Sequence, residues 1–497
     1  MHNEQIFTPD WVVNMMLDKI GYRPSADIHD KHIIDNSCGD GAFLVEIVDR
    51  YIKHGILDRN ISKNELKKGL EKYIHGIEID SNLCRKTVLR LNSVAAKYSI
   101  TGIEWDICNA DTVDCLNKYK LMDFVVGNPP YCKIHNLSQE KRLKYKQICG
   151  DAKGTFDSYV MFFWIGIKML KHTGKLIYIT PSSWTTSLYA QQFREWLLEK
   201  DGIITITDMQ HKKVFNEATT FTMITELGNW FHNESTKVYT FNEEGICKEV
   251  NNAPLKEYKI GDKSNFYFKC NEILSILRHI DDIEATDKVF TVKNGFATLN
   301  DKLFIGKMSE MAGFLGDPNM IFCTKASKNI LQSIIYPYDK EGKPLKFEEL
   351  SIPIQNILLR KAYELKVDTT KKSWYLYGRS QAINDVNKNK YAINNLIKTR
   401  EDIKLHYYCS ETGIYSGFYI LSKDDFRSSE VRQFVEETIN NNEFVNYIHS
   451  LGRYKNGGFS TFTTKELEKY LNFKWKERKN IFLTNFYDEK FGCIENK

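Results

Sequence analysis

Closely spaced cysteine pairs are missing from this chain of 497 residues. The 11 cysteines never form a Cys-x-x-Cys pair and follow no disulfide framework, so the sequence predicts reduced thiols and no metal site. The first residues, MHNEQIFTPDWV, lack the charged and apolar regions of a signal peptide. No apolar run approaches the ~20 residues of a membrane span. We therefore expect a cytoplasmic protein with no membrane partner.

A strong charge of one sign is also missing. Lys and Arg number 69 against 64 for Asp and Glu, a formal net charge of +5. This balance permits a nucleic-acid partner without requiring one. The hydrophobic content of 42% is enough for a core and for more than one domain.

Short apolar runs alternate with helical patterns through the first half of the chain. This alternation predicts an α/β fold with a parallel, doubly wound sheet, which binds ligands at the carboxyl ends of its strands. After about Trp230 aromatic and Asn/Lys-rich stretches replace the alternation. We therefore expect two domains, residues 1–255 and 256–497. The expected strands of the first domain are HIID, YIHGIEID, MDFVVG, GKLIYITP, GIITITDM and TTFTMITEL.

The stretch IIDNSCGDGAFL joins the first of these strands to a helix. Gly39 and Gly41 permit a tight turn and a close approach to a ligand, and the helix that follows presents free N–H groups. Asp35 at the strand end would repel a pyrophosphate but attract an ammonium group. The alternative is an ordinary tight connection between a strand and a helix.

Three further acidic residues follow strands of the predicted sheet. Glu78 is placed to accept hydrogen bonds from both hydroxyls of a ribose. Asp80 is equally suited to bind a ligand or to cap the helix that begins near Ser81. Asp111 either accepts from an adenine amino group or closes a turn.

The stretch DFVVGNPPY ends another strand in a stiff, polar turn. Asn128 offers a side-chain oxygen, and Pro129 offers a carbonyl without an N–H. Two fixed acceptors suit both hydrogens of an –NH₂ group. Tyr131 adds a flat surface for stacking a planar base, and the prolines keep the arrangement rigid. A purely structural turn explains the prolines but not the asparagine and tyrosine together.

An ordered series of segments resembles the gamma-class amino-methyltransferases of restriction-modification systems, which make N6-methyladenine in DNA. The resemblance covers Ile6 to about Leu227 and implies a class I S-adenosylmethionine-dependent methyltransferase sheet followed by a C-terminal α+β target-recognition domain. The segments are IFTP, DNSCGDGAFL, GIEID, NAD, VVGNPPY, KGTFDSYVMFF, GKLIYITPSSW and VFNEATTF.

The resemblance also implies roles for individual residues. Thr8 and Pro9 correspond to a lid over the methionine part of S-adenosylmethionine, and Asp35, Ser37 and Gly39 to the loop around it. Glu78 corresponds to the ribose ligand, with Asp80 beside it, and Asp111 to the partner of the cofactor's adenine. Asn128, Pro129, Pro130 and Tyr131 correspond to the catalytic tetrapeptide, and Asn128 also borders the cofactor. Phe215 corresponds to an aromatic residue that covers the other face of the target base, with Phe221 as a competitor.

The second half of the chain carries basic side chains interleaved with aromatic ones, which suit phosphate contacts and base stacking. Val292 to Gly306 and Leu451 to Asn472 resemble recurring segments of the recognition region. We expect DNA-facing loops at Lys371 to Gln381 and Gly452 to Gly458. The candidate DNA-binding residues are Arg379, Arg453 and Lys455, against the alternative of an ordinary solvated basic surface.

These features predict a site-specific adenine methyltransferase that flips its target base out of double-stranded DNA. The alternatives are an N4-cytosine methyltransferase, which needs the same geometry, and a protein-glutamine methyltransferase, whose amide carries the same –NH₂. A fused nuclease is disfavoured because the family segment begins at the N-terminus and no Asp…Glu-x-Lys cluster follows. We expect a monomer that is either the modification enzyme beside a separate cognate restriction endonuclease or an orphan methylase.

Overall fold

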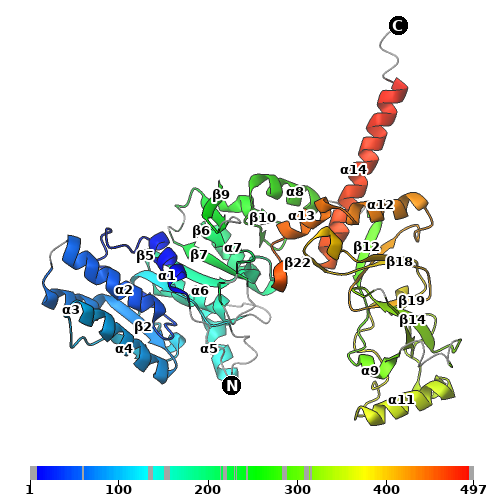
Figure 1. The fold of residues 1–497 in the computed structure, drawn as a ribbon, viewed down its shortest axis with the longest axis horizontal. Helices are drawn as coiled ribbons and strands as arrows, with labels where there is room; N and C mark the ends of the chain where they lie inside the picture. Colours follow the sequence, from blue (N-terminus) through cyan, green and yellow to red (C-terminus); the bar gives the residue numbers. More distant parts are fainter. Residues whose placement is uncertain are drawn as a thin grey trace, which may run out of the picture. The chain divides into compact units, whose positions relative to one another are not determined.

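The computed structural model divides into two compact units, residues 1–278 and 279–497 (Figure 1). None of the helices in the described part of the chain is both long and apolar enough to cross a membrane. The residues described are 8–58, 61–131, 138–149, 157–212, 214–215, 221–228, 230, 232–241, 245–282, 288–306, 313, 316–328 and 330–491.

A nine-stranded sheet in the order β3-β2-β1-β4-β5-β7-β6-β8-β9 forms the centre of the first unit. Strands β1 to β5 are parallel, β7 runs antiparallel to β5 and β6, and β9 runs antiparallel to β8. This arrangement confirms the predicted doubly wound sheet. The strands are β1 (Ile33–Asp35), β2 (Ile74–Glu78), β3 (Asp106–Asn109), β4 (Met122–Gly127), β5 (Leu170–Pro181), β6 (Ile203–Asp208), β7 (Thr222–Leu227), β8 (Thr236–Phe241) and β9 (Cys247–Ala253).

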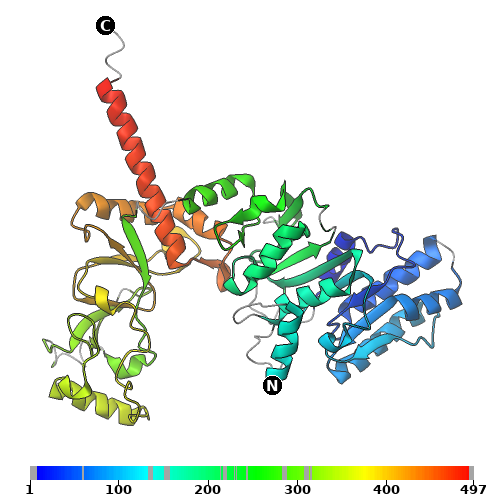
Figure 2. The same cartoon turned by 180° about the vertical axis from the view of Figure 1, so that it is seen from behind.

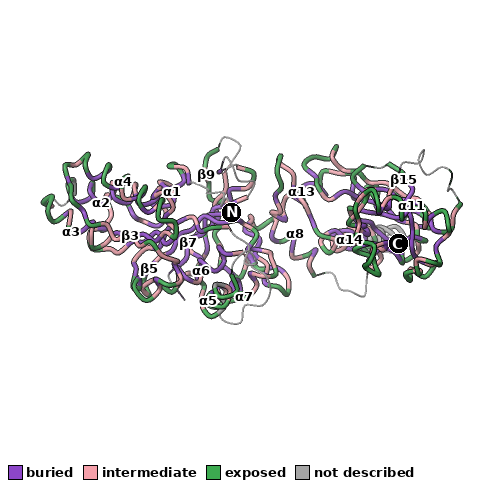
Figure 3. The backbone as a smooth tube through the Cα atoms, turned by 90° about the horizontal axis from the view of Figure 1, so that it is seen from below, coloured by how far each residue is buried: buried purple, intermediate pink, exposed green. Residues whose placement is uncertain are grey.

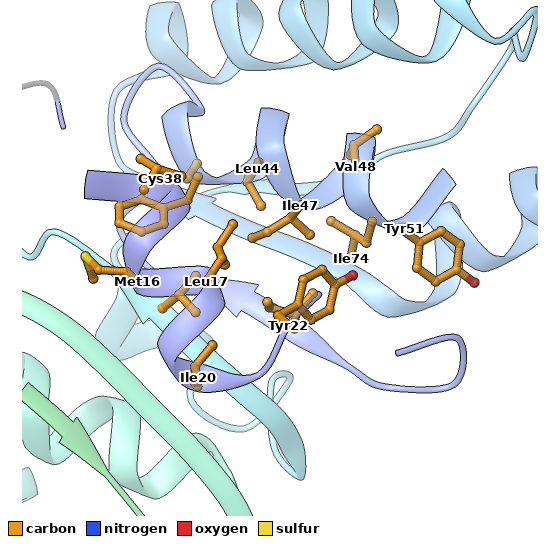
Figure 4. Close-up of a cluster of buried hydrophobic side chains, with 14 of the residues drawn as sticks. Met16, Leu17, Ile20, Tyr22, Cys38, Leu44, Ile47, Val48, Tyr51 and Ile74 are labelled. Atoms are coloured by element: carbon orange, nitrogen blue, oxygen red, sulfur yellow. The ribbon is translucent and has the colours of Figure 1, made fainter. Parts of the chain in front are cut away.

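Helices fill the connections between these strands because their apolar side chains recur with a helical period and face the sheet. Met16 and Leu17 of α1 pack with Leu44 and Ile47 of α2 and with Ile74 of β2 (Figure 4). The helices are α1 (Asp10–Ile20), α2 (Ala42–Lys53), α3 (Lys63–Tyr73), α4 (Ser81–Lys97), α5 (Gln139–Cys149), α6 (Ser158–Met169), α7 (Gln191–Lys200) and α8 (Asn271–Asp281).

Strand β5 separates two hydrophobic layers. Ile177 and Ile179 belong to the core that α1 and α2 cover. Tyr178 points the other way, and its ring lies 5.4 Å from that of Phe163 in α6. Successive side chains of a strand face opposite sides of the sheet, so α6 covers the face opposite α1 and α2. The neighbouring strand β7 is buried along its whole length (Figure 3).

The two compact units meet at residues 278 and 279, not near the expected boundary of 255 and 256. The hairpin of β10 (Lys259–Ile260) and β11 (Asn265–Phe266) packs on the first unit. The fully buried Arg194 of α7 donates hydrogen bonds to the carbonyls of Lys263 and Ser264. These bonds satisfy a buried guanidinium, and the sequence alone does not reveal a pairing across some 70 residues.

The second unit is built from short antiparallel sheets and helices, shown from behind in Figure 2 with α14 in red. One sheet has the order β12-β20-β16-β18 and another the order β13-β15-β14-β19, in which only β14 and β19 are parallel. Strands β17, β22 and β21 form a third. The strands are β12 (Phe290–Asn294), β13 (Ile305–Gly306), β14 (Met320–Lys325), β15 (Leu331–Ile335), β16 (Lys390–Ile393), β17 (Leu396–Ile397), β18 (Leu405–Tyr408), β19 (Thr412–Tyr415), β20 (Phe418–Ser422), β21 (Tyr454–Lys455) and β22 (Phe459–Thr461); the helices are α9 (Asp301–Phe304), α11 (Ile352–Glu364), α12 (Ser429–Ile439), α13 (Asn442–Ser450) and α14 (Thr464–Phe491).

Candidate active site

The strand order of the first unit reverses at β1, which pairs with β2 on one side and β4 on the other. In a doubly wound sheet this switch point opens a crevice outside the carboxyl ends of the strands. Asp35 ends β1, Glu78 ends β2 and Asn128 directly follows β4. The sheet therefore brings these three predicted residues to one edge.

The glycine turn after β1 bends toward the end of β2. The backbone N–H of Gly39 donates to the Glu78 carboxylate at 2.9 Å. Gly41 precedes α2 with a φ of +85°, and a Cβ there would lie 2.8 Å from a methyl carbon of Thr87. A side chain is therefore excluded at Gly41 by backbone conformation and by packing.

Asp35 is a buried carboxyl group. Burial raises its pKa to about 7, although the Ser37 N–H donates to it at 3.1 Å and partly opposes that rise. Gly127 lies against this carboxyl group with a φ of +151°, and a Cβ there would lie 2.8 Å from Asp35 Oδ1. A cation bound beside Asp35 would stabilise its charged form.

Glu78 and Asp80 have different surroundings. The Asp80 N–H donates to Glu78 at 2.8 Å, so two backbone amides orient the half-buried Glu78 carboxylate. The Asp80 side chain accepts from the N–H groups of Asn82 and Leu83 and caps α4. Capping of α4 explains why an acidic residue stands at position 80. The role of Asp80 as a cofactor ligand stays a prediction.

Asp111 begins a short 3-10 helix, Thr112–Cys115, just after β3. Its carboxylate accepts from the Val113 N–H at 3.3 Å and lies 3.5 Å from the Tyr145 hydroxyl, which donates to it. Asp111 thus closes a turn, and its predicted contact with an adenine is untested. Thr8 is buried, and Pro9 directly precedes α1, where its carbonyl accepts from the N–H groups of Val12 and Val13.

The turn after β4 has its side chains locked together. The Tyr131 hydroxyl donates to Asn128 Oδ1 at 2.5 Å and lies 3.3 Å from the Ile179 carbonyl, a second acceptor. The Ser158 hydroxyl at the start of α6 donates to the Pro130 carbonyl. No described residue donates to the Pro129 carbonyl. Tyr131 therefore engages one of the two predicted acceptors, and the other has no donor among the residues that the structure describes.

Two aromatic rings flank Tyr131. The ring of Phe215 lies 6.5 Å away at an interplanar angle of 63°, and that of Tyr159 lies 6.2 Å away at 83°. Phe221 instead contacts His211, and residues 216–220 between the two phenylalanines lie outside the described part of the chain. The structure thus places Phe215 beside Tyr131, and its expected role at the target base stays a prediction. Phe215 is only 3% exposed, so a base can enter between the two rings only if one of them moves.

Sequence reasoning missed two residues that hold this region in place. Asn36 is fully buried; its side chain accepts from the Tyr178 hydroxyl at 2.9 Å, and its carbonyl accepts from the Thr112 hydroxyl at 2.6 Å. It thereby ties the ends of β1, β3 and β5 together. Ser158 supports Pro130 in the same way. The sequence did contain a signal for Asn36: it is a second polar residue directly after Asp35, at the end of an apolar strand.

The three predicted DNA-binding residues lie in different environments of the second unit. Arg379 is exposed, and its guanidinium has no hydrogen-bond or ion-pair partner among the described residues. Arg453 pairs with Glu466 at 2.9 Å, an arrangement that supports the local fold. Lys455 is exposed at the end of β21. Of the three, Arg379 is the best placed for a ligand.

This edge of the sheet has features that fit S-adenosylmethionine. The buried Ser37 hydroxyl has no hydrogen-bond partner among the described residues, so a polar ligand group would satisfy it. Gly127 lies so close to Asp35 that an added Cβ would collide with its carboxyl group, so a side chain is excluded here. Asp35 suits an ammonium group and Glu78 suits the hydroxyls of a ribose. Among the described residues, no group of His, Cys, Asp or Glu side chains could hold a metal ion.

Known proteins resemble this chain over part of its length. The family model of the Eco57I restriction-modification methylase matches residues 47–215. The chain is 25% identical over 338 residues to the Type II methyltransferase M.BstVI of Geobacillus stearothermophilus, covering 60% of this chain and 59% of that protein. It is 22% identical to the Type II restriction enzyme and methyltransferase RM.Eco57I of Escherichia coli, covering 84% and 52%. The chain thus spans little more than half the length of these curated relatives.

Solved structures show the same fold. The Type IIL restriction-modification enzyme MmeI in complex with DNA matches 92% of this chain and 65% of its own, with a TM-score of 0.57 and 12% identity. A nuclease-deletion mutant of the Type ISP enzyme LlaGI matches 95% and 46%, with a TM-score of 0.58 and 11% identity. The predicted fold class and family resemblance are confirmed. Residues 47–215 of this chain are thus similar to the Eco57I restriction-modification methylase family, and they belong to a unit built on a doubly wound α/β sheet.

Proposed function

We propose that this protein transfers a methyl group from S-adenosylmethionine to N6 of an adenine that it flips out of double-stranded DNA. The observation that carries this proposal is the position of Asn128 Oδ1 and the Pro129 carbonyl. Both acceptors follow β4 at the switch point, where the carboxyl groups of Asp35 and Glu78 end the neighbouring strands. The amino group of the target base and the cationic cofactor would therefore bind side by side at this edge of the sheet.

The cofactor would lie along the ends of β1, β2 and β3. Asp35 would attract its ammonium group, while Ser37 and Gly39 line the turn beside it. Glu78, already oriented by two amides, would accept from the ribose hydroxyls. Asp111 would accept from the cofactor's adenine, with Thr8 and Pro9 over the methionine part. When bound, S-adenosylmethionine supplies a methyl group on a positively charged sulfur.

The chain's own contribution to the reaction is positioning. Asn128 Oδ1 and the Pro129 carbonyl would each accept one hydrogen of the target amino group. Held in this way, the nitrogen directs its lone pair toward the cofactor side of the crevice. Since the electrophile is already cationic, no base has to act first, and the surplus proton leaves to water after transfer.

Binding of the target requires a rearrangement of Tyr131. Its hydroxyl now donates to Asn128 Oδ1, and its ring borders the buried Phe215. An entering base would replace the hydroxyl as the donor to Asn128 and stack on the tyrosine ring. We expect Phe215 to cover the opposite face of the base.

The proposed substrate is DNA rather than protein because of the second unit. Its exposed Arg379, which pairs with none of the described residues, and its groove of polar and basic side chains suit a polyanion. We propose that the first unit binds the cofactor and catalyses transfer, and that residues 279–497 recognise the DNA site. We also propose that the protein is a cytoplasmic monomer and that it acts beside a separate cognate endonuclease.

The test is expression in a bacterial host that lacks adenine methylation, followed by single-molecule sequencing of its DNA. We expect N6-methyladenine within one defined sequence motif and none in cells that express Asn128→Ala. Detection of N4-methylcytosine alone would favour the cytosine alternative. Methylated protein together with unmodified DNA would contradict a DNA substrate altogether.

A further inference from the structure

A groove of about 1140 Å³ lies within the second unit, at the ends of strands from both of its four-stranded sheets. Among its described lining residues are three cationic and no acidic side chains: Lys293, Lys325 and Arg379. Lys293 pairs with Asp385 at 2.7 Å. Lys325 and Arg379 have no ion-pair partner among the described residues. The groove therefore presents two positive charges that remain available to a ligand.

The backbone holds Arg379 firmly at this groove. Its N–H donates to the Ala297 carbonyl at 2.9 Å, and the Ala297 N–H donates back to Arg379 at 3.0 Å. Close by, the Gln381 side chain donates to the Gly295 carbonyl at 3.1 Å. A rigid backbone that carries an exposed, unpaired guanidinium is the arrangement by which proteins read a nucleic-acid base, because little conformational freedom is lost on binding.

Leu299 lies over Gly378, the residue before Arg379, and has an unfavourable backbone conformation. Its φ is +60°, and its side chain is 74% exposed and lies over Gly378, where an added Cβ would meet it at 2.1 Å. The turn around it is fixed by a hydrogen bond from the Thr298 hydroxyl to Asp301 and by another from the Gly378 N–H to the Thr298 carbonyl. A leucine that is both strained and exposed does not serve the core, and such strain clusters at functional sites.

We propose that Arg379 and Leu299 together read one step of the target sequence from the major groove. The planar Arg379 guanidinium would donate two hydrogen bonds to N7 and O6 of a guanine. Leu299 would contact an adjacent apolar group, of which the thymine methyl is the one that the major groove offers. This inference rests on the proposed function and adds to it the residues that set the recognition sequence.

The test compares the methylated motifs of variants with that of the wild type, first defined by single-molecule sequencing. Arg379→Lys keeps the charge but loses the two-pronged donor. We expect it to relax one guanine position by roughly 5- to 150-fold in relative methylation rate, while the other positions stay unchanged. Leu299→Gly removes the apolar contact and also the strain, because glycine accepts this φ. It should relax a neighbouring position without lowering the melting temperature.

Arg360→Ala is the matched control, because Arg360 is an exposed arginine of α11 that does not line the groove. It should leave the motif unchanged. If Arg379→Lys and Arg379→Ala keep the full motif, or if Arg379→Ala lowers methylation equally at all sequences, Arg379 grips phosphate or contributes nothing and the inference is wrong. A wild-type protein that methylates no DNA would instead overturn the proposed function, and this inference with it.

Discussion

The side-chain oxygen of Asn128 is the acceptor on which the proposed chemistry depends. Asn128→Ala removes it, so we expect turnover to fall by about 100- to 1000-fold. Cofactor binding should change little, because Asp35 and Glu78 remain. Titration calorimetry with S-adenosylmethionine, together with methyl transfer to DNA, separates the two effects. Asn82→Ala, an exposed asparagine of α4, is the control and should match the wild type in both assays.

The two parts of the Tyr131 side chain have opposite expected effects on activity: the ring stacks on the target base, whereas the hydroxyl occupies Asn128 Oδ1. In Tyr131→Phe the ring is kept and Asn128 Oδ1 loses its internal donor, so we expect activity within a few-fold of the wild type. In Tyr131→Ala the stacking surface is lost, which costs about 1–3 kcal/mol per base, or roughly 5- to 150-fold. Methylation rates under single-turnover conditions measure both. If Tyr131→Phe is as impaired as Tyr131→Ala, the hydroxyl and not the ring is essential.

Asp35 makes cofactor affinity depend on pH. Its pKa, raised by burial to about 7, leaves the carboxyl group mostly neutral at pH 6 and mostly charged at pH 8. Only the charged form attracts an ammonium group, so we expect affinity for S-adenosylmethionine to rise from pH 6 to pH 8, by at most about tenfold per unit below the pKa. Equilibrium binding across this range measures it. Asp35→Asn should bind more weakly and lose this dependence; a flat wild-type profile would contradict the role of Asp35.

The same raised pKa has a consequence for stability without cofactor. The folded state holds the proton on Asp35 up to about pH 7, whereas the unfolded chain releases it near pH 4. The folded state therefore binds more protons between these values. The contribution of Asp35 to the free energy of unfolding consequently falls as pH rises from about 4 to 7.

At the scale of the elements, the close approach between the end of β4 and the Asp35 carboxyl group at the end of β1 depends on Gly127. In Gly127→Ala the new methyl group would press on the Asp35 carboxyl group, and φ would remain unfavourable. We expect a loss of about 1–3 kcal/mol in the free energy of unfolding and a marked loss of cofactor affinity. Gly21→Ala is the control: its φ is +88° but nothing lies within 4 Å of an added Cβ. It should lower stability while leaving affinity intact, as thermal unfolding and calorimetry will show.

The elements themselves could be predicted because their signals are local. Apolar runs that end in Asp35, Glu78 and Gly127 mark strands, and a doubly wound order places their ends together. The pairings between distant residues could not be predicted. The hydroxyl of Tyr131 on Asn128, the pairing of Arg453 with Glu466 and the burial of Phe215 depend on packing, and a single sequence carries no record of it.

At the scale of the molecule, the boundary between the units determines which fragment folds. A fragment of residues 1–278 keeps the β10–β11 hairpin, whereas residues 1–255 lose it. In the shorter fragment the buried Arg194 guanidinium would lack the carbonyls of Lys263 and Ser264. It would keep the carbonyls of Trp184 and Ser187 as acceptors, and each lost hydrogen bond to the charged group costs about 1.5–3 kcal/mol.

We therefore expect residues 1–278 to unfold cooperatively and to bind S-adenosylmethionine, and residues 1–255 to melt at a distinctly lower temperature or to aggregate. Residues 1–278 should also lose sequence-specific DNA binding, because base-edge contacts at several positions need the side chains that we assign to residues 279–497. Thermal unfolding and binding to the defined motif at fixed salt measure these outcomes. If residues 1–278 still methylate the same motif as the full chain, recognition resides in the first unit and the proposed division of labour is wrong.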